Sequence, residues 1–471
     1  MDLLTTHRAR ALALVPLMLF FFSCATYNTR ITGYYSQIRD NNFEKADAAL
    51  EHSSILKAKR NRLLYLLEKG KTTHLLGQYD SSNSYFNQAD LFIEDVRVSA
   101  GDIALSTLLN PMMSTYRGED FEKFMIHYYK ALNYLYLSKP DEALVEARRI
   151  TLQSYDQQEK SRRENRYSDD AFSLMLQGII YEKNNDINNA FIAYRNAVDI
   201  YLKHDNKYYG TQLPDQLKKD LLRTAAQNGF TDQVQQYEKL LNMTYNTNSP
   251  PDGGELVLFW ENGFAPVKQE QNFFFILTKD GLGNFTFVDD SGAFSIPFDF
   301  SSTNITSSDL KLDDLRSFRI AFPKYEEQPV YYQNAVLSLN NQQYGFEGAE
   351  DINALAFATL KERFLKEMGI ALSRLAVKKL AEIAARPKEG DKDKDTKEAI
   401  SMALQVFSFV SEKADTRNWQ SLPHTINYTR VPLQKGNNVL QVNLSGQTAQ
   451  TMELVTEGNG SLQVRNLCTL K

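Results

Sequence analysis

The sequence is poor in cysteine, tryptophan and histidine, because its 471 residues include two cysteines, two tryptophans and six histidines. Two cysteines allow at most one disulfide, which excludes a disulfide-stabilised fold. The histidines follow no metal-binding spacing and have no cysteine partner, so the sequence predicts no metal site. Phosphate-binding glycine loops and the nucleophile elbow of serine hydrolases are also missing. We therefore expect a protein that is not an enzyme and needs no cofactor.

The sequence also has no excess of positively charged residues. The chain has 53 Lys and Arg residues against 58 Asp and Glu residues, which gives a formal net charge of −5. Nucleic-acid binding requires a basic surface, so we expect no nucleic-acid partner. With 24% charged and 42% hydrophobic residues, the composition is typical of a folded protein, and the length predicts more than one domain.

Long hydrophobic runs are limited to one near the start, Ala11–Phe22, which follows a short basic stretch. Its 12 residues are too few to span a bilayer core, which needs about 20. Ser23 and Cys24 come next, in the order of a bacterial lipoprotein signal, although Phe21 stands where leucine is usual. We predict a signal peptide over residues 1–23 and a lipid on Cys24. The alternatives are an ordinary signal peptide cut nearby and an uncleaved anchor.

An internal repeat dominates the first half of the chain. A large residue, a small one, an aromatic and then small, aromatic and small residues follow one spacing at Leu174, Gly178, Tyr181, Ala190, Tyr194 and Ala197. The register recurs at Leu66, Gly70, Ser82, Phe86 and Ala89, and more loosely at His127, Ala131, Tyr134, Ala143 and Ala147. This spacing is typical of tetratricopeptide repeats, in which small residues let paired helices approach closely. We predict an α-solenoid of helix pairs over residues 27–246.

The second half has a different pattern, which begins after the turn-forming run at 245–254. Short apolar or alternating runs bounded by Asp, Gly and Asn predict strands near 255–260, 272–278, 284–288, 318–322, 330–339, 428–433, 439–444, 452–455 and 461–467. Apolar residues at helical spacing predict a helical insertion at about 350–415, either as one helix or as a pair broken near Gly369. The expected fold class is α+β multidomain, with a sandwich-like domain over 247–471.

One helix of the predicted repeats is a candidate partner-binding surface. Tyr129, Asn133 and Tyr136 share one face of the first helix of a repeat, and Arg148 and Arg149 lie late in the second helix. First helices line the concave groove of such stacks, where tyrosine and asparagine suit an extended peptide. The alternative is that the tyrosines pack against the next repeat and that the arginines are solvated or paired with nearby glutamates.

Several longer segments carry a resemblance to a known family. They are the cysteine of the lipoprotein signal and the segments Gly118–Arg149, Gly254–Lys268 and Ala414–Leu444. In these segments the chain resembles a family of uncharacterised bacterial envelope lipoproteins whose N-terminal half contains repeats. The resemblance implies an exported, anchored protein whose two halves belong together, and it implies no activity for any residue.

These features predict a lipid-anchored scaffold or adaptor of the cell envelope, which faces the periplasm from the outer membrane and binds envelope proteins through its repeats. Ala25 stands where an aspartate often retains lipoproteins in the inner membrane. One alternative is a glycan- or peptidoglycan-binding accessory protein, with Trp260 or Trp419 as a stacking platform. A second alternative is an enzyme of an unrecognised type. Cys468 would be left unpaired.

Overall fold

The structure, a computed structural model, describes residues 27–95, 111–149, 170–246, 251–279, 285–292, 294–298, 318–384 and 413–471. The expected signal peptide, residues 1–23, and Cys24 lie outside these ranges. Within them, no helix combines the length and the apolar character that a membrane span requires. All described residues therefore follow the expected anchor in the chain.

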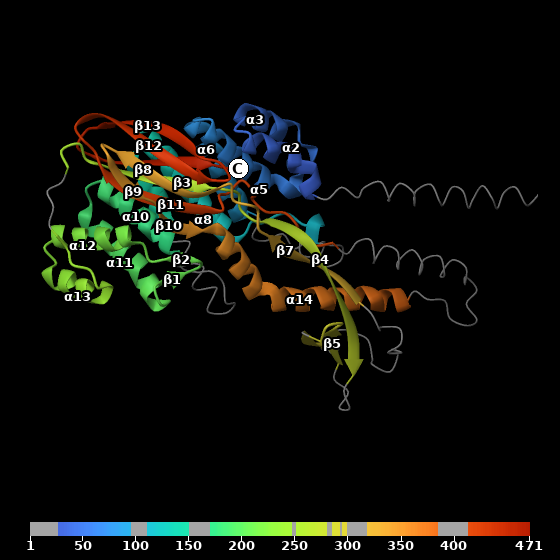
Figure 1. Ribbon diagram of the computed structural model, residues 1–471. Coiled ribbons are helices and arrows are strands. Elements are labelled where there is room, and N and C mark those ends of the chain that lie inside the picture. Colours follow the sequence, from blue (N-terminus) through green and yellow to red (C-terminus); the bar gives the residue numbers. More distant parts are fainter. Residues whose placement is uncertain are drawn as a thin grey trace, which may run out of the picture.

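The first half is helical, and most of its helices pack against the next described helix along the chain (Figure 1). The helices are α2 (Tyr27–Arg39), α3 (Phe43–His52), α4 (Ser54–Lys57), α5 (Arg62–Leu75), α6 (Tyr79–Asp95), α8 (Asp120–Tyr136), a helix at 140–149, α10 (Ala171–Lys183), α11 (Ile187–Lys203), α12 (Asp215–Gln227) and α13 (Thr231–Leu241). Short 3-10 turns occur at Lys59–Asn61 and Pro111–Met113, and a small hairpin, β1 (Lys207–Tyr208) and β2 (Thr211–Gln212), precedes α12. The prediction of helix pairs is confirmed.

Two glycines explain why these pairs pack closely. A Cβ atom added to Gly178 of α10 would lie 2.4 Å from the ring of Tyr194 in α11. At Gly70 of α5 the nearest ring atom of Phe86 in α6 would be 2.6 Å away. Both rings are fully buried. The repeated spacing of glycine and aromatic residues in the sequence therefore reflects one packing contact that is used twice.

The strands of the second half form three four-stranded sheets. They are β3 (Glu255–Asn262), β4 (Val267–Lys279), β5 (Phe285–Asp289), β6 (Ser295–Phe298), β7 (Phe318–Glu326), β8 (Tyr332–Leu339), β9 (Gln342–Gly345), β10 (Glu347–Asp351), β11 (Thr425–Pro432), β12 (Gly436–Gly446), β13 (Gln450–Gly458) and β14 (Leu462–Thr469). The sheet orders are β10-β11-β3-β14, β13-β12-β8-β9 and β6-β5-β4-β7. Within the first sheet β14 runs parallel to β3, whereas β11 pairs with β3 in the antiparallel direction.

The first sheet is the middle layer of the molecule. Leu256, Leu258 and Trp260 of β3 pack with the second sheet in a sandwich core. Val257 and Phe259 point the other way and share a core with the repeat helices. Because β3 is covered on both faces, its sequence is a continuous apolar run and not an alternating one. The molecule therefore has three layers: the repeat helices, the first sheet, which we call the inner sheet, and the second sheet, which we call the outer sheet.

The third sheet pairs with a long helix beside these layers. Helix α14 (Ile352–Ala384) is continuous through Gly369, so the alternative of a broken helix pair is wrong. Its Phe364 contacts Phe273 of β4 and Phe322 of β7, with ring centroids 5.8 and 4.8 Å apart. Most of the remainder of the predicted insertion, residues 385–412, lies outside the described ranges.

Candidate binding site at the junction of the two halves

The predicted groove residues are covered by the chain's own inner sheet. Tyr129 and Asn133 of α8 are both fully buried, and Tyr136 is half-buried. The interpretation of Tyr129 and Asn133 as an open surface for a partner is wrong in this structure. Tyr129 contacts Glu261 of β3, and Asn133 is enclosed by side chains of α5 and α6, namely His74, Ser82 and Asn83. The first helices of the repeats do line one face together, as expected. The inner sheet of the same chain, and not a partner, packs on this face.

Glu261 of β3 lies at the centre of this contact and is fully buried. Its carboxylate pairs with the ammonium of Lys71 from α5, and it accepts hydrogen bonds from Tyr128 Oη at 3.1 Å and Tyr129 Oη at 2.7 Å. Burial opposes ionisation, but the charge of Lys71 and the hydrogen bonds lower the pKa of Glu261 to about 2. A charged strand residue is therefore held by two different helices.

His74 of α5 extends the network toward the surface. Its Nδ1 lies 2.6 Å from Asn133 Oδ1, and its Nε2 lies 3.1 Å from Asn466 Nδ2 of β14. Because the amide nitrogen can only donate, Nε2 accepts and Nδ1 carries the proton. Burial, and then the nearby charge of Lys71, lower the pKa of His74 to about 4. The ring is therefore neutral at pH 7, and both of its nitrogens are in use.

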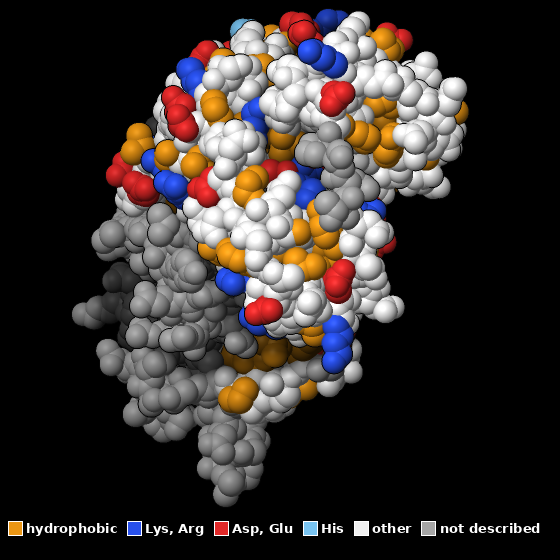
Figure 2. All heavy atoms as spheres, turned by 90° about the vertical axis from the view of Figure 1, so that its left-hand side faces the viewer, with side chains coloured by type: hydrophobic (Ala, Val, Ile, Leu, Met, Phe, Trp, Pro, Cys, Tyr) orange, Lys and Arg blue, Asp and Glu red, His pale blue; other side chains and the backbone are white. Residues whose placement is uncertain are grey.

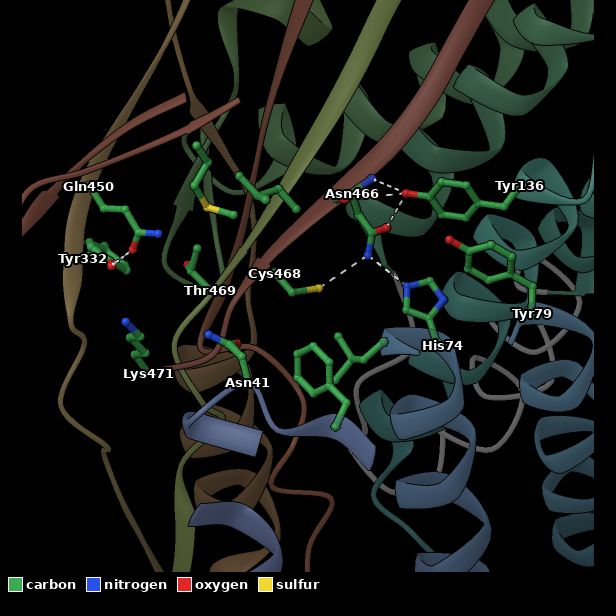
Figure 3. A pocket seen from close by; sticks show the side chains of 14 residues that line it. Asn41, His74, Tyr79, Tyr136, Tyr332, Gln450, Asn466, Cys468, Thr469 and Lys471 are labelled. Carbon is green, nitrogen blue, oxygen red and sulfur yellow. Dashed lines mark hydrogen bonds between the residues drawn. The ribbon is translucent and has the colours of Figure 1, made fainter. Parts of the chain in front are cut away.

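A pocket of about 330 Å³ lies beside this network, where the helices meet the inner and outer sheets (Figure 3). We call it the rim pocket. Its helical side includes Tyr79 of α6 and Tyr136 of α8, whose rings stack with centroids 4.5 Å apart. Its strand side includes Gln450 of β13 and Asn466 of β14, and Tyr136 Oη donates to Asn466 Oδ1 at 2.7 Å. Both halves of the chain are needed to form this pocket.

The chemistry of the rim pocket suits binding better than catalysis. Cys468 lines the pocket with its sulfur 3.6 Å from Asn466 Nδ2. Burial, and then the charge of Glu261, raise the pKa of the Cys468 thiol, so the nucleophilic thiolate is disfavoured at pH 7. With His74 neutral and engaged, the pocket offers stacked tyrosines, amides and the ammonium of Lys471 to a ligand.

The two predicted arginines lie apart from the rim pocket. Arg148 and Arg149 are exposed at the end of the helix at 140–149. Arg148 Nε donates to Tyr181 Oη at 3.2 Å, and Arg149 lies 3.7 Å from a carboxylate oxygen of Asp90. Of the five predicted partner-binding residues, only Tyr136 therefore lines the pocket.

A cluster of side chains near Arg149 is of the types that bind metal ions, but the ammonium of a lysine lies among them. Asp90, His127 and Glu146 bring potential ligand atoms within 4.8 Å of one another. The ammonium of Lys130 lies 2.7 Å from Asp90 Oδ2 and 2.9 Å from Glu146 Oε2. Since this buried ammonium and the guanidinium of Arg149 face the two carboxylates, the cluster is explained as an ion-pair network.

Both tryptophans are core residues. Trp260 is 3% exposed and donates from Nε1 to Thr469 Oγ1 at 2.8 Å, and Trp419 is fully buried. The interpretation of either as an open stacking platform for a glycan is wrong, because an indole ring in the core cannot contact a sugar.

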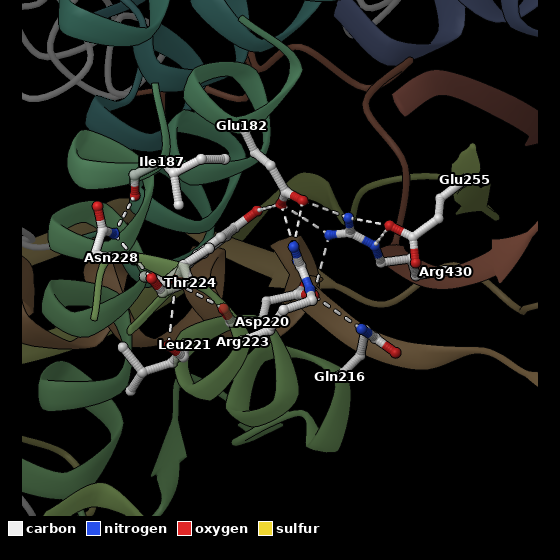
Figure 4. A network of polar contacts seen from close by, with 11 residues as sticks. Glu182, Ile187, Gln216, Asp220, Leu221, Arg223, Thr224, Asn228, Glu255 and Arg430 are labelled. Atoms are coloured by element: carbon white, nitrogen blue, oxygen red, sulfur yellow. Dashed lines mark hydrogen bonds and ion pairs between the residues drawn. The ribbon is translucent and has the colours of Figure 1, made fainter. Parts of the chain in front are cut away.

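A second buried network fixes the inner sheet to the repeats (Figure 4). Arg430 of β11 donates to Glu182 of α10 at 2.6 and 2.9 Å and to Asp220 of α12 at 3.0 Å. It also pairs with Glu255 of β3. Burial opposes ionisation of Glu182, but Arg430 and Arg223 hold its pKa well below the usual range. These contacts join two helices and two strands into one unit.

Sequence reasoning missed the residues that connect the halves. Glu261 and Arg430 are charged residues within largely apolar segments, whereas Lys71 lies in the polar run Glu68–His74. A charged residue within an apolar segment indicates a buried ion pair, because a buried charge needs a buried partner. The sequence does not say which residue the partner is. The repeat register also gives no role to Tyr79, which borders the rim pocket.

Comparisons with known proteins add little to this geometry. No family model matches the sequence, and no curated protein matches it. Two crystal structures of MamA have 14% and 12% identity, both with TM-scores of 0.27, and cover 46% and 45% of this chain and 92% and 87% of their own. The apo form of RapI has 14% identity and a TM-score of 0.32, and covers 48% of this chain and 56% of its own. TM-scores of this size do not establish a common overall fold.

Proposed function

We propose that the protein is a non-catalytic scaffold of the bacterial cell envelope, anchored through a lipid on Cys24 and facing the periplasm from the outer membrane. A partner protein docks at the rim pocket. The observation that carries this proposal is that the pocket is formed jointly by the repeats and both sandwich sheets, and that buried ion pairs hold the inner sheet on the repeats. A fixed concave surface favours specific binding because little order has to be gained on association.

The assignment of no enzymatic activity rests on how the buried ionisable groups are used. Among the described residues, Glu261 is neutralised by Lys71 and Glu182 by Arg430. Glu119 is likewise held by Lys268 and Arg363. Carboxylates paired in this way are not available as a general acid or base. Glu68, whose pKa burial raises to about 7, has hydroxyl partners and no cation within the described ranges, but it is fully buried and does not line the rim pocket.

The anchor is tested by Cys24→Ala, with Cys468→Ala as the matched control because these are the two cysteines of the chain. Metabolic labelling with a fatty-acid analogue should mark the wild type and Cys468→Ala, and should not mark Cys24→Ala. The last variant should also stay unprocessed or leave washed membranes. Equal labelling of all three proteins would refute lipidation at Cys24.

The docking site is tested by Tyr79→Ala, with Tyr85→Ala as control. Both tyrosines lie on α6 and both are half-buried, but only Tyr79 lines the rim pocket. Proteins cross-linked in living cells and co-purified with the chain should be lost in Tyr79→Ala and kept in Tyr85→Ala. If the two variants recover the same partners as the wild type, the rim pocket is not the docking site.

A cell-wall glycan is the second candidate ligand. The observation that favours it is that the stacked pair Tyr79 and Tyr136 lines the same pocket as the amides of Asn41 and Gln450, since sugar rings bind aromatic faces and amide groups. The purified protein would then sediment with isolated cell-wall sacculi, and Tyr79→Ala would not. Sedimentation of neither protein would exclude the glycan and leave the protein partner.

A further inference from the structure

One face of the third sheet is apolar and open. Helix α14 covers the face that carries Phe273 and Phe322. Side chains on a strand alternate between faces, so Phe274 and Ile276 of β4 point to the opposite side, where they are 47% and 48% exposed. Within the part of the chain that the structure describes, no helix packs on that opposite face.

The open face changes character along β4. Near the start of the strand it is polar, because Arg319 of β7 pairs with Glu270 and donates to Asn272 Oδ1 at 3.0 Å. Farther along it is apolar, and Ile276 has Val288 of β5 as its cross-strand neighbour. Hydrophobic side chains are visible at the lower end of the molecule in Figure 2, the level at which Figure 1 places the tip of β4 and β5. The apolar part of the open face therefore lies near the tip of β4 and β5.

The start of β4 lies beside the start of the first described helix. Asn28 of α2 donates from Nδ2 to the backbone oxygen of Lys268 at 2.8 Å, and it accepts a hydrogen bond from Gln420 at 2.7 Å. Tyr27 next to it is buried. Cys24 precedes Tyr27 by three residues, which span about 10 Å at most when fully extended. A lipid on Cys24 would therefore hold the membrane surface close to the polar end of β4.

We propose that Phe274, Ile276 and Val288 form a face that contacts the lipid surface in which Cys24 is anchored. The inference rests on the proposed lipidation. At about 3.3 Å per residue, Phe274 lies roughly 20 Å along β4 from Lys268, so a short tether keeps it within reach of the bilayer. Exposed aromatic and aliphatic side chains bind at the boundary between headgroups and acyl chains. The lipid surface accounts for the apolar end, and the polar end lies beside the tether at the level of the polar headgroups.

Photo-cross-linking in native membranes tests this contact with the full-length protein. p-Benzoylphenylalanine replaces Ile276 in one protein and Val455 in the other. Val455 is the matched control because it is an exposed aliphatic strand residue of equal exposure, 47%, on the outer sheet. Irradiation of cells that contain radiolabelled phospholipid should give a labelled adduct several-fold stronger at position 276 than at 455. Thermal melting checks that both proteins are folded.

Each other outcome overturns a defined part of the inference. Adducts at 276 with a second copy of the chain or with another protein would show that the face is a protein interface. Equal lipid labelling at 276 and 455 would show that the face has no preferred contact with the membrane. A wild-type chain that is released from washed membranes would refute the anchor itself, whereas a membrane-bound chain without an adduct at 276 would refute the contact face alone.

Discussion

At the residue scale, Gly178 shows how one side-chain atom decides the fit of a helix pair. A Cβ atom there would meet the buried Tyr194 ring at 2.4 Å, so Gly178→Ala should lower the free energy of unfolding by about 1 to 3 kcal/mol. Gly33→Ala is the control, because no atom lies within 4 Å of the added Cβ in helix α2, and alanine should stabilise this helix by up to about 1 kcal/mol. Denaturant unfolding of both variants measures the difference. Equal effects would contradict the packing explanation.

Tyr129 is the clearest case of a predicted surface residue that belongs to the core. Its spacing predicts a position in a partner-binding groove, where truncation of the side chain would cost little stability. Since its ring is fully buried and its hydroxyl is bound to Glu261, Tyr129→Ala should instead cost about 3 to 5 kcal/mol. Arg148→Ala, at an exposed position, should change stability by less than about 0.5 kcal/mol. Thermal melting that showed both variants to be unchanged would mean that α8 does not contact the sheet.

Glu68 predicts a pH dependence. It is fully buried among the hydroxyls of Tyr34, Tyr35 and Ser421, and burial raises the pKa of its carboxyl from 4.5 to about 7. A raised folded-state pKa gives stability that is present below pH 4.5 and is lost as the pH rises through 7. Relative to Glu68→Gln, the wild type should therefore lose about 2 to 4 kcal/mol between these pH values. Unfolding curves of both proteins from pH 4 to 8 test this, and parallel profiles would contradict it.

At the scale of elements, Arg430 connects β11 to α10 and α12. Arg430→Met would leave the buried carboxylates of Glu182 and Asp220 short of a cation, so we expect a loss of about 3 to 5 kcal/mol. Hydrogen exchange should increase first in α10, α12 and β11, because these elements lose their common partner. Arg465→Met is the control, since Arg465 makes one backbone contact at 3.4 Å from β14. Unchanged protection in Arg430→Met would show that the network does not couple these elements.

The elements themselves were largely predictable, because their signals are local. Apolar periodicity located the helix pairs, and short apolar runs located strands such as β3 and β14. The short strands β6, β9 and β10 were missed because each has only four or five residues, too few to show a clear alternating pattern. The capping at the start of α8 was also recognisable, since Glu122 accepts a hydrogen bond from the backbone nitrogen of Glu119 at 2.9 Å.

At the scale of the whole molecule, the two halves share one hydrophobic core that runs from α2 to β14. Residues 27–246 produced alone would expose the sheet-facing sides of α5, α8 and α10, so we expect them to be insoluble or self-associated. Co-expression with residues 251–471 should restore a soluble complex, because the missing layer is then supplied in trans. Size-exclusion chromatography measures this. A monomeric, stable first half would show that the repeats form an independent domain.

The candidate site could be predicted only in part, and the reason is its distance in sequence. Tyr136 was singled out because its position on α8 follows from helical spacing. Its partner Asn466 is 330 residues away, and Glu261 is 190 residues from Lys71. No local pattern reports which segments meet over such separations, so the rim pocket, which depends on both halves, was not foreseen.

By itself the sequence determined the order of helices and strands and the close helix pairs around Gly70 and Gly178. These depend on hydrophobic periodicity, side-chain size and backbone preference, which act between near neighbours. Only the tertiary structure decided that the inner sheet, and not an external partner, covers the helix-lined face. That outcome depends on complementary shape and on buried charges meeting opposite charges across the molecule, as Glu261 meets Lys71 and Arg430 meets Glu182.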